Sequence, residues 1–353
     1  MNARLKSAVS VLTAACSTGV LTSCKTVQTT LTGSGPAADR IAHLSWFMTI
    51  LFIVVTLVMW GLIAWAVLKR RGTLAEHEPI DAGGGQMWIL IGGLAVPLIV
   101  LTIIFVLGLN LLNDFPIHGM HGGMVHRSAE MQMMLKPEIR IIGHQWWWEV
   151  EYLNDNPSKQ FTTANEIHLP AHRPVNIEVV TRDVMHSFWI PALHGKVDLI
   201  PGHPNYIRLE GSQAGNYAGQ CAEFCGAQHA HMRLLAVVQE PEDYEAWLDG
   251  ERKPSATPTS PEAIAGQQTF EAGPCSMCHQ IRGTISGGRV APDLTHFGSR
   301  QLLASNSFPN NTAYLEAWIT HAQSLKPEAQ MPDLTQFTGE QLQQLVAYLR
   351  QLQ

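Results

Sequence analysis

The sequence predicts a multidomain chain with a two-helix transmembrane hairpin, an all-β sandwich and a small all-α domain. Residues 44–68 and 87–112 contain no charged side chain, which is typical of membrane spans. The region from about 130 to 245 has short alternating runs separated by Pro, Gly and Asn, which favours strands. A Pro-rich stretch at 250–261 then separates a C-terminal part, 262–353, with helical patterns near both ends. With 353 residues, 46% of them hydrophobic, the chain has room for two or three domains.

The first 24 residues have the pattern of a signal peptide. Arg4 and Lys6 precede an apolar stretch that is too short and too rich in Ser and Thr to cross a bilayer. The stretch ends at Leu21-Thr22-Ser23-Cys24, which is similar to a bacterial lipoprotein cleavage site. Lipidation of Cys24 and cleavage without a lipid both remain open from the sequence.

The two uncharged runs predict a hairpin of transmembrane helices within residues 40–114. Each run exceeds the ~20 residues needed to cross the hydrocarbon core. Lys69-Arg70-Arg71 lies between them and predicts a cytoplasmic connecting loop, because positively charged loops stay inside. We therefore expect a two-pass protein of the bacterial inner (plasma) membrane, with its later domains on the periplasmic side. A helical hairpin buried in a soluble core is the alternative, which runs of this length disfavour.

Periodicity locates strands and helices in the rest of the chain. Residues 175–179 and 206–210 alternate apolar with polar side chains, and 234–238 is a buried-strand pattern. Helices are expected over 261–270 and over 338–349, the second with Thr338 as its cap. A net charge of −6 argues against a nucleic-acid partner.

Soft metal ligands are concentrated in one segment of the predicted sandwich. Cys221, Cys225, His229 and Met232 follow one another at spacings of four, four and three residues. Thiolate, imidazole and thioether ligands suit copper, and two thiolates can bridge two coppers that each need a histidine. His186 is the best candidate for the second imidazole. A structural zinc site and a Cys221–Cys225 disulfide are the alternatives.

A second motif predicts covalent haem in the C-terminal domain. Cys275 and Cys278 flank two residues and are followed at once by His279, the pattern of c-type haem attachment with His279 as an iron ligand. Met331 is the favoured sixth ligand, since a thioether raises the potential as an electron carrier requires. His296 and His321 are the other candidates for that position.

Three segments together resemble subunit II of cytochrome c oxidase. They are the run from Gly219 to Met232, the run Val184-Met185-His186-Ser187-Phe188-Trp189-Ile190-Pro191, and Gly143-His144-Gln145-Trp146-Trp147-Trp148. The resemblance implies a cupredoxin-like sandwich with a binuclear copper centre, CuA, and implies that electrons enter at Trp146. It assigns the copper ligands to His186, Cys221, Cys225, His229, Met232 and the backbone carbonyl of Glu223.

The resemblance implies two further features. The Glu223 side chain would reach a magnesium ion shared with subunit I. Residues 262–353 are similar to a class I cytochrome c domain, with Met331-Pro332 at its axial position, and the fusion of the two resembles caa-type haem-copper oxidases. Three consecutive tryptophans cannot all face one side of a strand, so we also expect at least one of them to be exposed.

The resemblance implies an electron-transfer subunit of a larger oxidase. Electrons would pass from cytochrome c, or from a quinol-cytochrome c reductase, through haem c and CuA to the haem-copper site of subunit I. There oxygen would be reduced to water with proton translocation. Subunit I, the other oxidase subunits and membrane lipid are the implied partners. The alternatives are a CuA-bearing subunit of a nitric oxide reductase and a membrane-anchored copper-binding protein, whereas quinol oxidase subunits lack these copper ligands.

Two weaker features concern the loops beside the second helix. The His- and Met-rich segment 117–126 could collect copper or could be a plain connector. Many members of the family have a Glu shortly before this helix that helps to admit protons, whereas this chain has Asp81 and no Glu there. The route of proton uptake therefore stays open.

Overall fold

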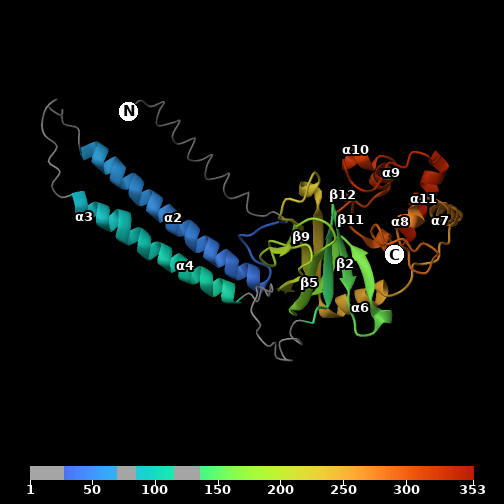
Figure 1. Ribbon diagram of the computed structural model, residues 1–353, viewed down its shortest axis with the longest axis horizontal. Coiled ribbons are helices and arrows are strands. Elements are labelled where there is room, and N and C mark those ends of the chain that lie inside the picture. The colour runs from blue at the N-terminus through green and yellow to red at the C-terminus, as the bar shows by residue number, and fades with distance from the viewer. Residues whose placement is uncertain (1–27, 70–84, 115–135) are drawn as a thin grey trace. The chain divides into compact units, whose positions relative to one another are not determined.

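The structure is a computed structural model that describes residues 28–69, 85–114 and 136–353 (Figure 1). The signal-peptide region with Cys24, Arg70 and Arg71 of the basic loop, Asp81 and the segment 117–126 lie outside the described residues. The described chain forms two compact units, one over residues 39–116 and one that contains residues 117–353.

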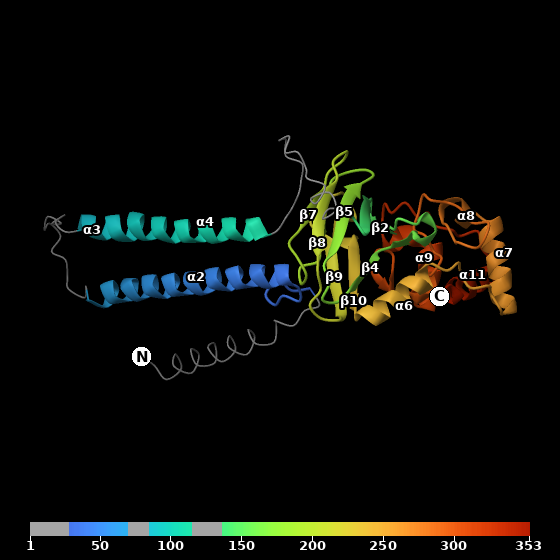
Figure 2. The same cartoon turned by 90° about the horizontal axis from the view of Figure 1, so that it is seen from below.

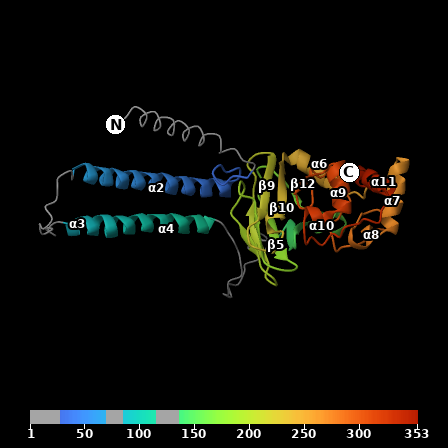
Figure 3. The same ribbon diagram turned by 90° about the horizontal axis from the view of Figure 1, so that it is seen from above.

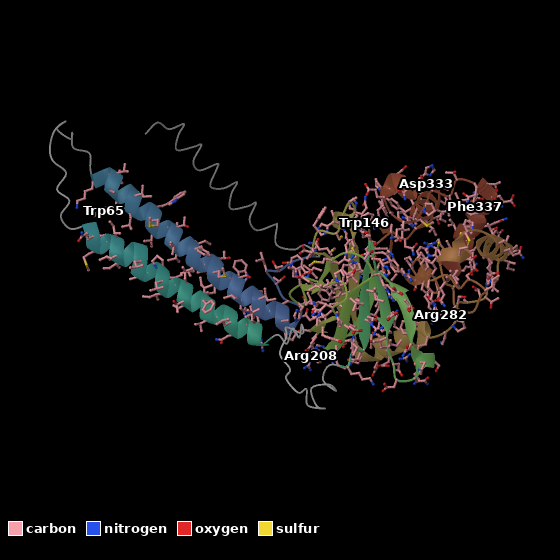
Figure 4. All side chains as sticks on the ribbon, in the orientation of Figure 1. Trp65, Trp146, Arg208, Arg282, Asp333 and Phe337 are labelled. Carbon is pink, nitrogen blue, oxygen red and sulfur yellow. The ribbon has the colours of Figure 1, made fainter. Side chains whose placement is uncertain are left out.

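The smaller unit contains two helices that are long and apolar enough to cross a membrane. Helix α2 runs from Pro36 to Lys69, so it begins eight residues before the predicted start at Leu44. Pro36 is tolerated there because the first turn of a helix has no partner for its N–H. At the other end the Lys69 ammonium lies 4.7 Å from the centre of the Trp65 ring, a residue labelled in Figure 4.

The second of these helices is interrupted near its start. It consists of α3 (Gly85–Leu90), a π-helical turn (Ile91–Ala95) and α4 (Val96–Asp114). Pro97 has no N–H to donate to the carbonyl of the residue four positions earlier, which explains an irregular turn at this point. Figure 3 shows α2 and α4 running alongside each other.

The middle of the chain folds into two five-stranded sheets packed face to face (Figure 2). One sheet has the order β3-β2-β1-β5-β8 and the other has the order β4-β10-β9-β6-β7. The strands are β1 (Ile139–His144), β2 (Trp147–Tyr152), β3 (Phe161–Ala164), β4 (Glu166–Pro170), β5 (Val175–Thr181), β6 (His186–Trp189), β7 (Val197–Leu199), β8 (Asn205–Leu209), β9 (Gly215–Cys221) and β10 (Arg233–Gln239).

The alternation seen in the sequence places the sandwich core. In β5 the residues Val175, Ile177 and Val179 are fully buried while their neighbours are only partly buried. Trp148 and Phe188 meet edge to face in the centre, with ring centroids 5.9 Å apart. A helix that the sequence did not predict, α6 (Pro241–Glu251), then packs against β4 and β10.

The C-terminal domain is built around two crossing terminal helices. These are α7 (Pro261–Ala272) and α11 (Gly339–Gln351), and Thr338 caps α11 in a capping box with Gln341. A Cβ on Gly266 would lie 2.0 Å from the Gln344 carbonyl oxygen, so only glycine permits so close a crossing. The shorter elements are α8 (Cys275–Cys278), a 3-10 turn (Phe297–Ser299), β11 (Leu302–Leu303), β12 (Phe308–Pro309), α9 (Thr312–Thr320) and α10 (Ala322–Leu325).

Candidate metal centre and haem cleft

Two strand ends and one loop bring the predicted copper ligands together. His186 is the first residue of β6, and Cys221 is the last residue of the neighbouring strand β9. The Cys221 N–H donates to the Met232 carbonyl at 2.9 Å, which closes the loop that carries Cys225 and His229. The sheet thus fixes both ends of the ligand loop.

The donor atoms form one compact cluster. The two thiol sulfurs, Cys221 Sγ and Cys225 Sγ, are 3.8 Å apart. His186 Nδ1 lies 3.9 Å from the first, and His229 Nδ1 lies 3.6 Å from the second. Met232 Sδ is 3.8 Å from Cys225 Sγ. Every side-chain donor that the sequence nominated therefore lies beside one of the two cysteines, and the ligand atoms of His186, Cys221 and Cys225 are all within 4.8 Å of one another.

Glu223 contributes to this cluster through its backbone. Its carbonyl oxygen lies 3.2 Å from Cys221 Sγ. Its carboxylate instead forms an ion pair with Lys196, at 3.7 Å, and the side chain is 41% exposed. The carbonyl thus lies among the candidate copper ligands, whereas the carboxylate lies beside Lys196 in a solvent-accessible position.

The electrostatics of the thiol pair favour one preformed thiolate. A hydrogen bond from the Cys225 thiol, together with one from His186, lowers the pKa of Cys221 to about 3 despite burial. The Cys221 thiolate in turn raises the pKa of the Cys225 thiol. Burial by itself would lower the pKa of His186, but its hydrogen bonds with Asp183 and Cys221 outweigh burial and raise it. The second thiolate therefore needs a metal cation to form.

This donor set fits a pair of copper ions. Two thiolates, two imidazoles and a thioether would supply soft or intermediate donors that suit copper, and a backbone carbonyl would add one hard oxygen ligand. A single structural zinc would use four of these and leave Met232 and the Glu223 carbonyl without a function. The two cysteines are free, and their 3.8 Å separation is far beyond the ~2.05 Å of a disulfide bond.

Asp183, which was not among the residues expected from the sequence, orients one ligand. Asp183 Oδ1 lies 2.8 Å from His186 Nε2 and leaves Nδ1 to face Cys221. The same carboxylate accepts hydrogen bonds from the backbone N–H groups of Gln145 and Val184, both at 2.7 Å. A carboxylate behind a metal-ligating histidine fixes the tautomer and the ring orientation. Asp183 lies three residues before His186, which is the signal that could have identified it.

A cleft of about 350 Å³ opens in the C-terminal domain beside the haem-attachment motif. Its walls include Cys275, Cys278 and His279 as well as apolar side chains from the terminal helices. His279 Nδ1 is hydrogen-bonded to the Pro292 carbonyl at 2.7 Å, which leaves Nε2 as the free ring nitrogen. An apolar cleft with two thiols and an imidazole at one wall suits a covalently attached haem.

The structure separates the three candidates for the sixth iron ligand. Met331 lines the cleft, and its carbonyl is held by Gln323 Nε2 at 2.7 Å. His296 is buried outside the cleft, where its Nε2 meets the Lys253 carbonyl at 3.1 Å. His321 is exposed and also lies outside the cleft lining. Of the three candidates, only Met331 lines the cleft, so its thioether would be the second axial ligand beside His279.

Trp146 lies where the two sites approach each other (Figure 4). Its indole Nε1 donates to the Cys225 carbonyl at 2.9 Å, and the same residue lines the haem cleft together with Gln145 and Trp147. The expectation that one of the three tryptophans is exposed is wrong. Trp146 and Trp148 are buried and Trp147 is partly buried, stacked on His144 at 4.3 Å. The C-terminal domain covers the face that the sequence suggested was free.

Comparison with known proteins gives two family matches in the order of the two sites. The family described as cytochrome c oxidase subunit II, periplasmic domain, matches residues 153–239, and the family described as cytochrome c matches residues 263–353.

Individual relatives extend the same result. Cytochrome c oxidase subunit 2 of Alkalihalophilus pseudofirmus is 39% identical over 214 residues, which cover 61% of this chain and 60% of that protein. The Bacillus subtilis protein of the same name is 25% identical over 316 residues, 86% of this chain and 85% of the relative. A solved periplasmic domain of subunit II from Bradyrhizobium japonicum is 27% identical and covers 33% of this chain and 94% of its own, but its TM-score of 0.31 adds nothing to the assignment. The chain therefore carries the periplasmic domain of the cytochrome c oxidase subunit II family, followed by a domain of the cytochrome c family.

Proposed function

We propose that this chain is the electron-accepting subunit of a bacterial respiratory cytochrome c oxidase. It would take electrons from a cytochrome c or a quinol-cytochrome c reductase at its own haem domain. It would deliver them through the copper cluster to subunit I, where oxygen is reduced to water with proton translocation. When bound, haem c and the copper pair would each supply reversible one-electron chemistry.

One observation carries this proposal more than any other. A single residue, Trp146, lines the haem cleft with one part of its surface and donates a hydrogen bond to the Cys225 carbonyl with another. The indole thus bridges the wall of one redox site and the ligand loop of the other. A copper-storage protein has no need for such a bridge.

The copper loop, from Cys221 to Met232, is suited to an electron carrier whose geometry changes little on reduction. Cys221, Cys225 and Met232 are each at most 3% exposed, so little water has to reorganise when the charge of the centre changes. Asp183 holds the ring of His186 from outside the cluster. Both features keep the donor positions constant while an electron arrives and leaves.

The remaining assignments are part of the same proposal. Residues 1–24 would direct export, the hairpin within 40–114 would anchor the chain to the inner membrane and its lipid, and residues 130–245 and 262–353 would work on the periplasmic side after the linker at 250–261. The Glu223 carboxylate, which is partly exposed beside Lys196, would reach a magnesium ion shared with subunit I. The other oxidase subunits complete the assembly.

Metal and haem analysis of the full-length chain tests the proposal directly. We expect two coppers and one c-type haem per chain, with an EPR signal from one electron shared over both coppers. Zinc in place of copper, or a chain without haem, would refute it. Oxygen uptake by the complex assembled with subunit I then separates an oxidase from a nitric oxide reductase.

A further inference from the structure

The backbone carbonyl of Trp146 is held by two side chains of the haem domain. Ser305 Oγ donates to it at 2.6 Å, and the Lys326 ammonium donates to it at 2.8 Å. Both donors are almost fully buried, with exposed fractions of 2% for Ser305 and 3% for Lys326. Two residues that lie 159 and 180 positions away along the chain therefore meet one carbonyl.

Burying the charged Lys326 ammonium beside a carbonyl destabilises the fold. Taking a charge out of water is unfavourable, and burial lowers the pKa of this amine to about 7. The carbonyl would keep the Ser305 hydroxyl as a donor without it, so the ammonium is not needed to prevent an orphaned acceptor. An uncharged side chain of similar length would cost the fold less.

Ser305 reaches the same carbonyl from a strained turn. Ala304, Ser305 and Asn306 have φ angles of 53°, 56° and 57°, in the left-handed region that residues other than glycine rarely adopt. Such a turn persists only where its surroundings fix it, and here Asn306 Nδ2 is bonded to the Asn165 carbonyl at 2.9 Å. A buried charge and a strained turn thus converge on one atom of the sandwich.

That atom belongs to the residue that bridges the two redox sites. The backbone of Trp146 is held by the haem domain, while its ring is held by the Cys225 carbonyl on the copper loop. A shift of the carbonyl would therefore move the indole relative to both sites. Electron transfer slows steeply as the distance between redox centres grows. The position of the Trp146 carbonyl therefore affects the rate of transfer between the two sites.

We propose that Lys326, assisted by Ser305, is a positioning residue for electron transfer, because its ammonium locks the Trp146 carbonyl and so fixes the indole between the haem cleft and the copper loop. This inference rests on the proposed function, since it requires that electrons cross from the haem domain to the copper site.

The test replaces Lys326, which also lines the haem cleft, with Leu in the full-length chain loaded with haem and copper, because leucine offers the iron no ligand. Rapid photoreduction of the haem, followed by optical detection of copper reduction, gives the rate of transfer within the chain. We expect the rate to fall at least ~10-fold, since a displacement of ~1 Å can cost up to ~100-fold. The thermal unfolding midpoint at neutral pH should stay the same or rise, because the buried charge is gone. Hydrogen exchange at the backbone of Trp146 and Trp147 should become faster.

Two further variants keep the inference open to refutation. Lys253→Leu removes the same charge from an exposed position before the haem domain, and it should leave the transfer rate unchanged. Lys326→Gln retains a hydrogen-bond donor, so its rate should lie between those of wild type and Lys326→Leu. An unchanged rate in Lys326→Leu, an equal loss in Lys253→Leu, or a lowered unfolding midpoint would overturn the positioning role. A wild-type chain that shows no transfer at all would refute the proposed function instead.

Discussion

The copper loop and the haem cleft differ in how much of each site the polypeptide builds by itself. In the copper loop His186, both cysteines and Met232 are buried, and each donor lies 3.2–3.9 Å from at least one cysteine sulfur, with the ends of β6 and β9 holding the group. The haem cleft is open, and Cys278 at its wall is exposed. The sandwich therefore brings its candidate metal ligands together by itself, whereas the small helical domain lines a cleft that haem would occupy. This difference predicts that the fold of the helical domain depends on its cofactor more than the fold of the sandwich does.

The largest expected effect comes from breaking the preformed cluster. Cys225 contacts three other donors, so Cys225→Ser should disrupt the ligand set that would hold the two coppers. We expect copper affinity to fall by more than the ~10–100-fold that loss of an outer partner costs. The shared-electron EPR signal should disappear while the haem absorbance stays. Cys278→Ser is the matched variant, because it should weaken haem attachment and leave two coppers in place.

Withholding the cofactors should separate the two domains. Without copper, the sandwich core around Trp148 and Phe188 remains intact, so amide protection in β5 and β10 should survive chelation. Without haem, the cleft of about 350 Å³ leaves Phe270, Leu345 and Leu349 facing an empty space, and residues 262–353 should lose their protection. Hydrogen exchange measured by mass spectrometry on both apo forms checks this. Equal protection of the two domains without haem would show that the helical domain does not depend on its cofactor for folding.

A third prediction concerns the pH dependence of the unfolding free energy that Lys326 causes at the boundary between the two domains. Burial holds the pKa of Lys326 at about 7 in the folded chain, below its value of 10.5 when exposed. Between these values the unfolded chain binds more protons, so the unfolding free energy should rise with pH from about 7 to 10.5. The gain is at most about 1.4 kcal/mol per pH unit and up to about 5 kcal/mol in all.

Denaturant titrations at pH 7.5 and pH 9 measure this slope. The difference between wild type and Lys326→Leu isolates the contribution of one amine, since other titrating groups are common to both. The variant should be the more stable chain at the lower pH, and the two should converge as pH rises. Parallel pH profiles for the two chains would show that the amine is hydrated in the folded state.

Local patterns in the sequence predicted the parts of the fold and site that depend on near neighbours. Uncharged runs predicted the two long helices, alternation predicted strands such as β5, and the spacing from Cys221 to Met232 brought the copper donors together. The π-helical turn before Pro97 and helix α6 were missed, although each follows from a proline in the sequence.

Relations across the domain boundary could not be predicted in this way. At least one of the three tryptophans was expected to be exposed, because the chain that covers Trp146 follows more than 150 residues later. Lys326 carries no local signal of burial, since lysine is ordinarily a surface residue. The contacts that join the two domains therefore could not be predicted from periodicity.

The smallest change in stability is expected from loss of the Thr338 cap of helix α11 in the helical domain. Thr338 caps α11, with its hydroxyl accepting from the Gln341 N–H at 3.2 Å and the Gln341 side chain returning to the Thr338 N–H at 3.0 Å. Thr338→Ala should therefore cost about 1 kcal/mol in the unfolding free energy of the haem domain. Because α11 packs mainly on α7, copper content and protection in β5 should be unchanged. Thr338→Ser restores the hydroxyl and should recover the loss. If Thr338→Ala also weakened the copper site, the two domains would fold as one cooperative unit, and the preformed character of the copper loop would depend on the domain that covers it.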